Sequence, residues 1–70
     1  MNNKASKETA KRIKAIRLRK GLTQLALAEK AGINVNYYSK VERAELKPSV
    51  DILEKIVKAL GVKSSDIFPF

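Results

Sequence analysis

The sequence contains no cysteine, no histidine and no tryptophan, and it has only three glycines and two prolines. Without cysteine, neither a disulfide framework nor a thiolate metal site can stabilise so short a chain, so apolar packing must do so. Without histidine or cysteine, and with its aspartates and glutamates scattered rather than paired, the chain lacks a constellation for acid–base, nucleophilic or metal chemistry. The sequence therefore predicts a protein that is not an enzyme and that needs no cofactor.

Long apolar runs are also missing. The longest mainly apolar stretch, residues 50–62, is interrupted by Asp51, Glu54, Lys55 and Lys58, which argues against a membrane span. The first residues, Met1 to Lys4, lack the apolar core of a signal peptide. We therefore expect a cytoplasmic protein.

What the sequence does have is positive charge, and that charge is unevenly spread. The net charge is +8, and residues 1–20 hold eight lysines and arginines against one glutamate, whereas residues 44–70 hold four basic against four acidic residues. This asymmetry favours a polyanionic partner. Nucleic acid, an anionic membrane surface and mere solubility are all open explanations at this level.

The hydrophobic pattern predicts an all-α fold with five helices in one domain over residues 1–70, of which residues 1–5 are expected to be flexible. The start signals are Ser6, Thr23, Asn34 and Ser49, and the stop signals are Gly21, Gly32 and Gly61. The helices predicted from these signals span residue 6 or 7 to residue 20, then 24–31, 35–43 and 50–60, with a final short turn at 66–68.

The second and third predicted helices meet at a single corner, Ala31-Gly32. Two short amphipathic helices around such a corner are the sequence form of a helix-turn-helix. In that motif the second helix protrudes far enough to enter a DNA major groove. Residues 24–43 therefore predict duplex DNA as the partner, which would place the protein at the nucleoid.

The outer face of the third predicted helix carries the candidates for base reading. Asn36 suits adenine, Lys40 suits guanine, and Val35 suits a thymine methyl group. Asn34 lies at the start of this helix, and Arg43 at its end is placed to reach a base or a phosphate. The alternative is that these residues form only a solvated helix face.

Contacts to the DNA backbone are expected at the rim of the same motif. Gln24 begins the second helix, where free N–H groups and the helix dipole attract phosphate, although a plain helix-start role is also open. Tyr37 and Tyr38 point about 100° apart, so we assign Tyr38 to the core and Tyr37 to the rim. The phosphate candidates are Thr23, Gln24, Tyr37, Ser39 and Lys47.

Glu42 is an acid within the predicted reading helix, where phosphates would repel it. A buried partner would keep its charge off the DNA surface. Arg17, on the inner edge of the first helix, is the candidate for a structural ion pair, and an exposed pair of little energetic value is the alternative.

These segments together resemble the Xre or Cro/C1-type helix-turn-helix repressors, over about residues 10–68. The matching pieces are IKAIRLRKGLTQ at 13–24, LAEKAGI at 27–33, YYSKVER at 37–43, KPSVDILEKI at 47–56 and ALGV at 59–62. The resemblance implies a compact five-helix, lambda-repressor-like fold and a sequence-specific transcriptional regulator. It also implies a backbone contact at Gln24, base readers at Asn34, Val35, Asn36 and Lys40, and an ion pair between Arg17 and Glu42.

The sequence departs from the family pattern in three places. Leu25-Ala26 replaces a polar pair, which leaves Leu25 open to solvent. Ala44 stands where glycine is usual, which argues against a left-handed turn there. Leu46 replaces a polar or basic residue and so removes one potential phosphate contact.

Small members of this family resemble restriction-modification controllers, phage repressors and antitoxins, which usually act as homodimers on inverted repeats. The candidate dimer surface is Ile52, Ile67, Phe68 and Phe70, although Ile67 is also a candidate for the core. An alternative function is a protein-binding module, such as an antitoxin that covers a toxin with Leu25, Leu46 or the C-terminal aromatic residues.

Overall fold

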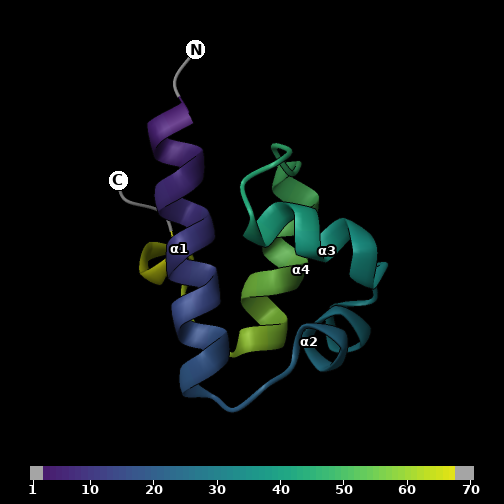
Figure 1. The fold of residues 1–70 in the computed structure, drawn as a ribbon. Coiled ribbons are helices and arrows are strands. Elements are labelled where there is room, and N and C mark those ends of the chain that lie inside the picture. The colour runs from purple at the N-terminus through teal and green to yellow at the C-terminus, as the bar shows by residue number, and fades with distance from the viewer. Residues whose placement is uncertain (1–2, 68–70) are drawn as a thin grey trace.

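The computed structural model describes residues 3–67, and within that range it contains helices and no strand (Figure 1). The elements are α1 (Asn3–Arg19), α2 (Gln24–Ala31), α3 (Val35–Glu42), α4 (Val50–Leu60) and a single 3₁₀ turn, η1 (Ser64–Asp66). The all-α prediction is confirmed, but the count of five helices is wrong. The Asp66 and Ile67 N–H groups donate to the Lys63 and Ser64 carbonyls at 2.9 and 3.0 Å. These are i→i+3 bonds, so the fifth element is one 3₁₀ turn rather than an α-helix.

Polar caps begin the three short α-helices where the sequence predicts them. The hydroxyl of Thr23 accepts from the Ala26 N–H at 3.0 Å, and the hydroxyl of Ser49 accepts from the Ile52 N–H at 3.2 Å. Gly32 and Gly61 end α2 and α4 in the left-handed conformation, with φ of 74° and 72°.

Two helix boundaries differ from the prediction. α1 begins at Asn3, before the Ser6 or Lys7 start that its N-cap signal suggested, because Lys4 and Ala5 are helix formers that offer no stop. α3 ends at Glu42, and Arg43 is its C-cap rather than its last helical residue. The expected flexibility of residues 1–5 falls in part on residues 1–2, which lie outside the described residues, and it stays a prediction.

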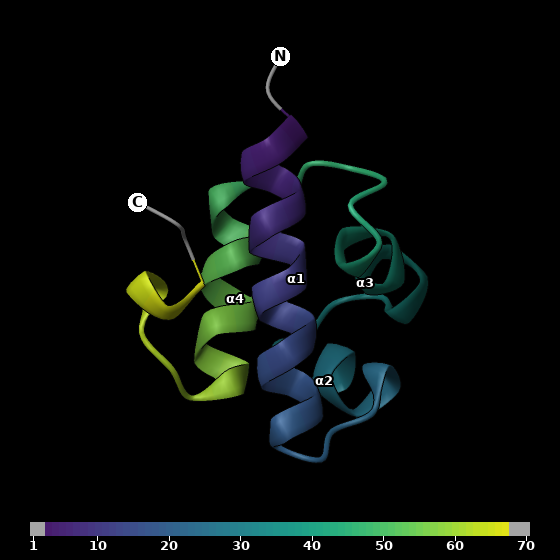
Figure 2. The same cartoon turned by 60° about the vertical axis from the view of Figure 1, so that its left-hand side comes forward.

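One core joins all the elements. α2 lies against α3 and α4, α1 lies against α3, and in Figure 2 α1 passes in front of α4. The buried apolar cluster is Ile13, Ile16, Leu27, Ala28, Tyr38, Val41, Leu53, Ile56, Ala59, Leu60 and Ile67. Each α-helix contributes its apolar side, as the helical spacing of these residues predicts.

The structure corrects the predicted dimer surface. Ile67 is fully buried in the core of its own chain, because the η1 turn brings residue 67 onto the helices. It is therefore not a dimer contact. Ile52 is half-buried against the core, while Phe68 and Phe70 lie outside the described residues.

The turn after α3 is left-handed in spite of its alanine. Ala44 has a φ of 59°, and among the described residues it is the one non-glycine with a positive φ. The Ala44 N–H donates to the Val41 carbonyl at 3.0 Å, and the Glu45 N–H donates to the Lys40 carbonyl at 2.9 Å. These bonds end the helix, and Leu46 then packs against the core. The expectation that Ala44 would not adopt this conformation is wrong, because long-range packing of the loop overrides the local preference.

Within residues 3–67, no helix is both long and apolar enough to cross a bilayer. The same part of the chain holds no group of three or more histidine, cysteine, aspartate or glutamate side chains arranged to bind a metal ion.

Candidate nucleic-acid interface

α2 and α3 form a helix-turn-helix around the predicted corner. Gly32 takes the left-handed conformation, and the Ile33 N–H donates to the Ala28 carbonyl at 2.9 Å. The side-chain oxygen of Asn34 then accepts from the N–H groups of Asn36 and Tyr37 at 2.8 and 3.2 Å, which starts α3. The corner therefore fixes the direction of α3 through backbone bonds and one cap.

α3 has a buried side and an exposed side. Tyr38 and Val41 are buried, whereas Asn36 and Lys40 are exposed to solvent. Asn34 is also exposed, but its side-chain oxygen is occupied by the cap. Val35 is half-buried and packs against the core, so only part of its surface is available to a ligand. The exposed side thus presents the Asn36 amide, which is not used as a cap, and the Lys40 ammonium group, about one helical turn apart.

Arg43 lies at the C-terminal end of α3 and is already paired. Its guanidinium donates to the Glu45 carboxylate at 2.9 and 3.2 Å, and both side chains are exposed. This hydrogen bond raises the pKa of Arg43 and lowers the pKa of Glu45. This pair could not be predicted from the sequence, because residues 43 and 45 face one another through the left-handed turn at Ala44.

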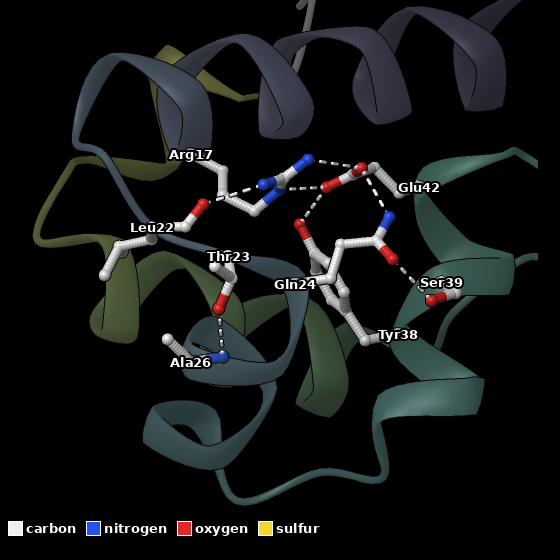
Figure 3. A network of polar contacts seen from close by, with 8 residues as sticks. All are labelled: Arg17, Leu22, Thr23, Gln24, Ala26, Tyr38, Ser39 and Glu42. Carbon is white, nitrogen blue, oxygen red and sulfur yellow. Dashed lines mark hydrogen bonds and ion pairs between the residues drawn. The ribbon is translucent and has the colours of Figure 1, made fainter.

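The predicted pair between Arg17 and Glu42 is present and buried (Figure 3). The Arg17 Nε and Nη2 atoms donate to the two carboxylate oxygens of Glu42 at 2.7 and 3.0 Å. The Arg17 Nη1 atom donates to the Leu22 carbonyl at 2.7 Å. The guanidinium thus ties α1 both to α3 and to the loop before α2.

Three further side chains complete a network around Glu42. The Tyr38 hydroxyl donates to Glu42, the Gln24 amide nitrogen donates to Glu42 at 2.8 Å, and the Ser39 hydroxyl donates to the Gln24 amide oxygen at 2.8 Å (Figure 3). Both ends of the Gln24 amide are therefore engaged within the chain. Among the described residues, no buried side-chain nitrogen or oxygen lacks a hydrogen-bond partner.

This network changes the roles expected of Gln24 and Ser39. The sequence predicts both as phosphate contacts, but the structure places their polar groups between α2 and α3. A signal for this arrangement was available: Glu42 lies four residues after Tyr38 and three after Ser39, so both side chains are its neighbours on α3. What the sequence could not supply is that the start of α2 lies against that side.

The network keeps Glu42 ionised. Burial by itself raises the pKa of its carboxyl, but the hydrogen bonds from Arg17, Tyr38 and Gln24 together outweigh burial, so the pKa lies below its usual value. Burial and the neighbouring carboxylate raise the pKa of Tyr38, which stays a neutral donor. The hydrogen bond to Glu42 raises the pKa of Arg17. The acid in α3 is thus neutralised inside the protein.

Residues 13–67 match the family model described as Helix-turn-helix. That match covers more than half of the chain and contains all of α2, α3 and α4. The chain belongs to the helix-turn-helix family.

Relatives within this family carry regulatory names. The chain is 46% identical over 56 residues to the immunity repressor protein of Bacillus phage phi105, a match that spans 80% of this chain and 39% of the repressor. It is 38% identical over 60 residues to the control protein C.BamHI of Bacillus amyloliquefaciens, spanning 84% of this chain and 74% of that protein. The chain thus spans less than half the length of the phage repressor.

A solved structure of similar size has the same fold. The restriction-modification controller protein C.AhdI from Aeromonas hydrophila matches with a TM-score of 0.86 and 29% identity, over 89% of this chain and 94% of the controller. The similarity covers nearly the whole of both chains, so the helix-turn-helix and the helices that support it are shared.

The remaining phosphate candidates lie at the rim of this helix-turn-helix. Thr23 precedes α2 and is exposed, with its hydroxyl occupied as the cap. Tyr37 is half-buried, and Lys47 is exposed in the loop after α3. The polar groups of Gln24 and Ser39 are paired within the chain, whereas the Lys47 side chain is exposed to solvent.

Proposed function

We propose that residues 1–70 form a single DNA-binding domain, and that the protein is a transcriptional regulator that binds a specific duplex sequence with α3 in the major groove. The observation that carries this proposal is the division of α3 into two sides. Tyr38 and Val41 are buried, Glu42 is neutralised by Arg17, and Asn36 and Lys40 are exposed. Because Glu42 is buried and paired with Arg17, its charge is not presented to the phosphates that line a DNA groove. The proposal includes no enzymatic activity.

The base readers proposed from this geometry are Asn36 and Lys40, with help from Asn34, Val35 and Arg43. Asn36 would pair with adenine and Lys40 with guanine, as the donor and acceptor pattern of the major groove requires. The exposed edge of Val35 would contact a thymine methyl group. Arg43 would reach the DNA after exchanging the Glu45 carboxylate for a base or a phosphate.

We assign the contacts to the DNA phosphates to protein groups that the network around Glu42 does not engage. These are the side chains of Lys47 and Tyr37 and the backbone N–H groups that follow Thr23 at the start of α2. Gln24 and Ser39 would act through the network that holds α3, since their side chains already have partners.

We further propose a homodimer on an inverted-repeat operator. A two-fold pair would present two α3 helices about 34 Å apart, one turn of the duplex. Ile52 and the exposed Val50 at the start of α4 offer the apolar surface for this contact. The names of the relatives, a phage immunity repressor and a control protein, support a regulatory role.

Selection of bound sites from a random duplex pool tests this function. We expect enrichment of a motif with two-fold symmetry. Asn36→Ala should then lower the preference for that motif over a random duplex by about 1–3 kcal/mol, with little effect on random DNA. Asn3 belongs to α1, and Asn3→Ala is the matched control, which should leave the preference unchanged. Equal loss on both duplexes would remove Asn36 as a reader, and enrichment of no motif would overturn the function.

A second candidate is a protein-binding module, such as an antitoxin. Leu18 and Leu25 favour it, because they are 58% and 52% exposed. Leu46 packs against the core, and the C-terminal aromatic residues lie outside the described part of the chain. Failure of the DNA selection, together with a stoichiometric complex with the product of an adjacent gene that Leu25→Lys abolishes, would support this candidate instead.

A further inference from the structure

A groove of about 280 Å³ lies between the N-terminal half of α1 and the C-terminal end of α3. Its lining residues are Lys7, Ala10, Lys11, Glu42, Arg43 and Ala44. Three cations therefore border the groove from two elements far apart in sequence. The small side chains of Ala10 and Ala44 leave the space between them open.

The acidic groups near this groove are already engaged. The Glu42 side chain is 2% exposed and paired with Arg17. Glu8, which is the single acid in residues 1–20, pairs with Arg12 at 3.2 Å. Within residues 7–67, neither Lys7 nor Lys11 forms an ion pair with an acidic side chain. The rim of the groove thus carries the positive charges of Lys7 and Lys11 over a neutralised floor, while Arg43 is paired with Glu45.

Arg43 connects the groove to α3, because its backbone N–H closes the C-terminal end of that helix and the same residue lines the groove. A duplex held by α3 in its major groove brings phosphates along both edges of that helix. We propose that this groove receives the DNA backbone, with Lys7, Lys11 and Arg43 contacting phosphates beside the reading site. This inference rests on the proposed function and adds α1 to the binding surface.

Arg43 would change partner on binding. In the free protein its guanidinium donates two bonds to the Glu45 carboxylate. A phosphate presents a similar pair of oxygens and carries the same kind of charge, so it can replace the carboxylate in a bidentate contact. Glu45 then acts as an internal competitor that weakens binding to every duplex alike.

The experiment compares two double variants that remove the same charge. Lys7→Gln/Lys11→Gln removes the two lysine charges from the rim of the groove. Lys55→Gln/Lys58→Gln removes the charges of two exposed lysines on α4. Binding to the selected duplex and to a random duplex of equal length is measured at several salt concentrations. Thermal melting verifies that both variants are folded.

For the groove variant we expect the slope of log affinity against log salt to become shallower by about 2, because two phosphate contacts are lost. Affinity should fall by the same factor on both duplexes. The α4 variant should change the slope by less than half that amount, since its lysines act only at a distance. Glu45→Gln should strengthen binding to both duplexes several-fold.

Equal slope changes in the two double variants would overturn the groove assignment and leave only a general charge effect. An unchanged or weaker affinity in Glu45→Gln would overturn the exchange of partners at Arg43. Failure of the proposed function looks different: the wild-type protein would then show no preference for any sequence, whatever the slopes of the variants.

Discussion

Ala44 is a residue whose backbone conformation is set by the surrounding fold and not by its own preference. A left-handed conformation costs an L-residue about 1–2 kcal/mol, because its Cβ approaches the following carbonyl. The chain accepts that conformation at Ala44, where φ is 59°, since the turn must carry residues 45–48 from the end of α3 to α4. The structure therefore retains local strain at the C-terminal end of α3.

Ala44→Gly should relieve that strain. We expect the free energy of unfolding to rise by about 0.5–1 kcal/mol, because glycine adopts this φ without a Cβ clash. Part of that gain is offset, since glycine has more conformational freedom than alanine in the unfolded chain. Urea unfolding followed by circular dichroism measures the change. Ala15→Gly is the control: Ala15 is exposed within α1, where glycine should destabilise by about 1 kcal/mol. Destabilisation by both substitutions would contradict the strain at Ala44.

At the scale of the elements, α3 is held by side chains from two other helices. Arg17 reaches Glu42 from α1, and Gln24 reaches Glu42 and Ser39 from the first residue of α2. A helix of eight residues is too short to be stable alone, so its direction depends on such contacts and on its buried side. The network thereby links the orientation of α3 to the protonation of one carboxyl.

Tyr38→Phe removes one donor to Glu42 and keeps the ring in the core. At neutral pH we expect a loss of about 1.5–3 kcal/mol of unfolding free energy, the usual size for a hydrogen bond to a charged group. The wild-type pKa of Glu42 is lowered, so its stabilising effect is present above the ordinary glutamate value of about 4.3 and is lost as the pH falls through the lowered value.

The pH dependence distinguishes this mechanism from a packing defect. Without the Tyr38 donor the pKa of Glu42 rises, so acid unfolding of Tyr38→Phe should begin at a higher pH than that of the wild type. The difference between the two proteins should shrink once both carry a protonated Glu42. Tyr37→Phe, at the half-buried neighbouring tyrosine, is the matched control and should follow the wild-type profile. A pH-independent difference would contradict the role of the hydroxyl.

At the scale of the whole molecule, the predicted dimer needs an apolar surface that the single chain leaves uncovered. Ile67 cannot supply it, because the core of its own chain buries it. Val50, at the first position of α4, is 68% exposed, and the half-buried Ile52 follows two residues later. The start of α4 is therefore the described part of the predicted interface.

Val50→Lys should weaken self-association by roughly tenfold, or about 1.4 kcal/mol, if α4 forms the two-fold contact. Sedimentation velocity over a range of protein concentrations measures the monomer–dimer equilibrium. Leu18→Lys is the control, since Leu18 is 58% exposed on α1 and outside the predicted interface. A wild-type protein that stays monomeric, or equal effects of the two variants, would contradict this arrangement.

The sequence by itself determined the features that depend on near neighbours. Thr23, Asn34 and Ser49 cap helices at the expected residues, because a cap is a bond between a side chain and an N–H two or three residues later. The apolar periodicity of α3 placed Tyr38 in the core and Asn36 outside it. The partner of Glu42 was also predictable, because phosphates would repel an acid on a helix predicted to face DNA unless a cation compensates its charge.

Only the tertiary structure decided what depends on segments far apart in the chain. It turned Gln24 and Ser39 inward, buried Ile67, and set Lys7 and Lys11 beside Arg43. It also imposed the left-handed turn at Ala44 that lets Glu45 reach Arg43. Each of these outcomes follows from the distance between helices in the packed core, and residue spacing along the sequence carries no information about that distance.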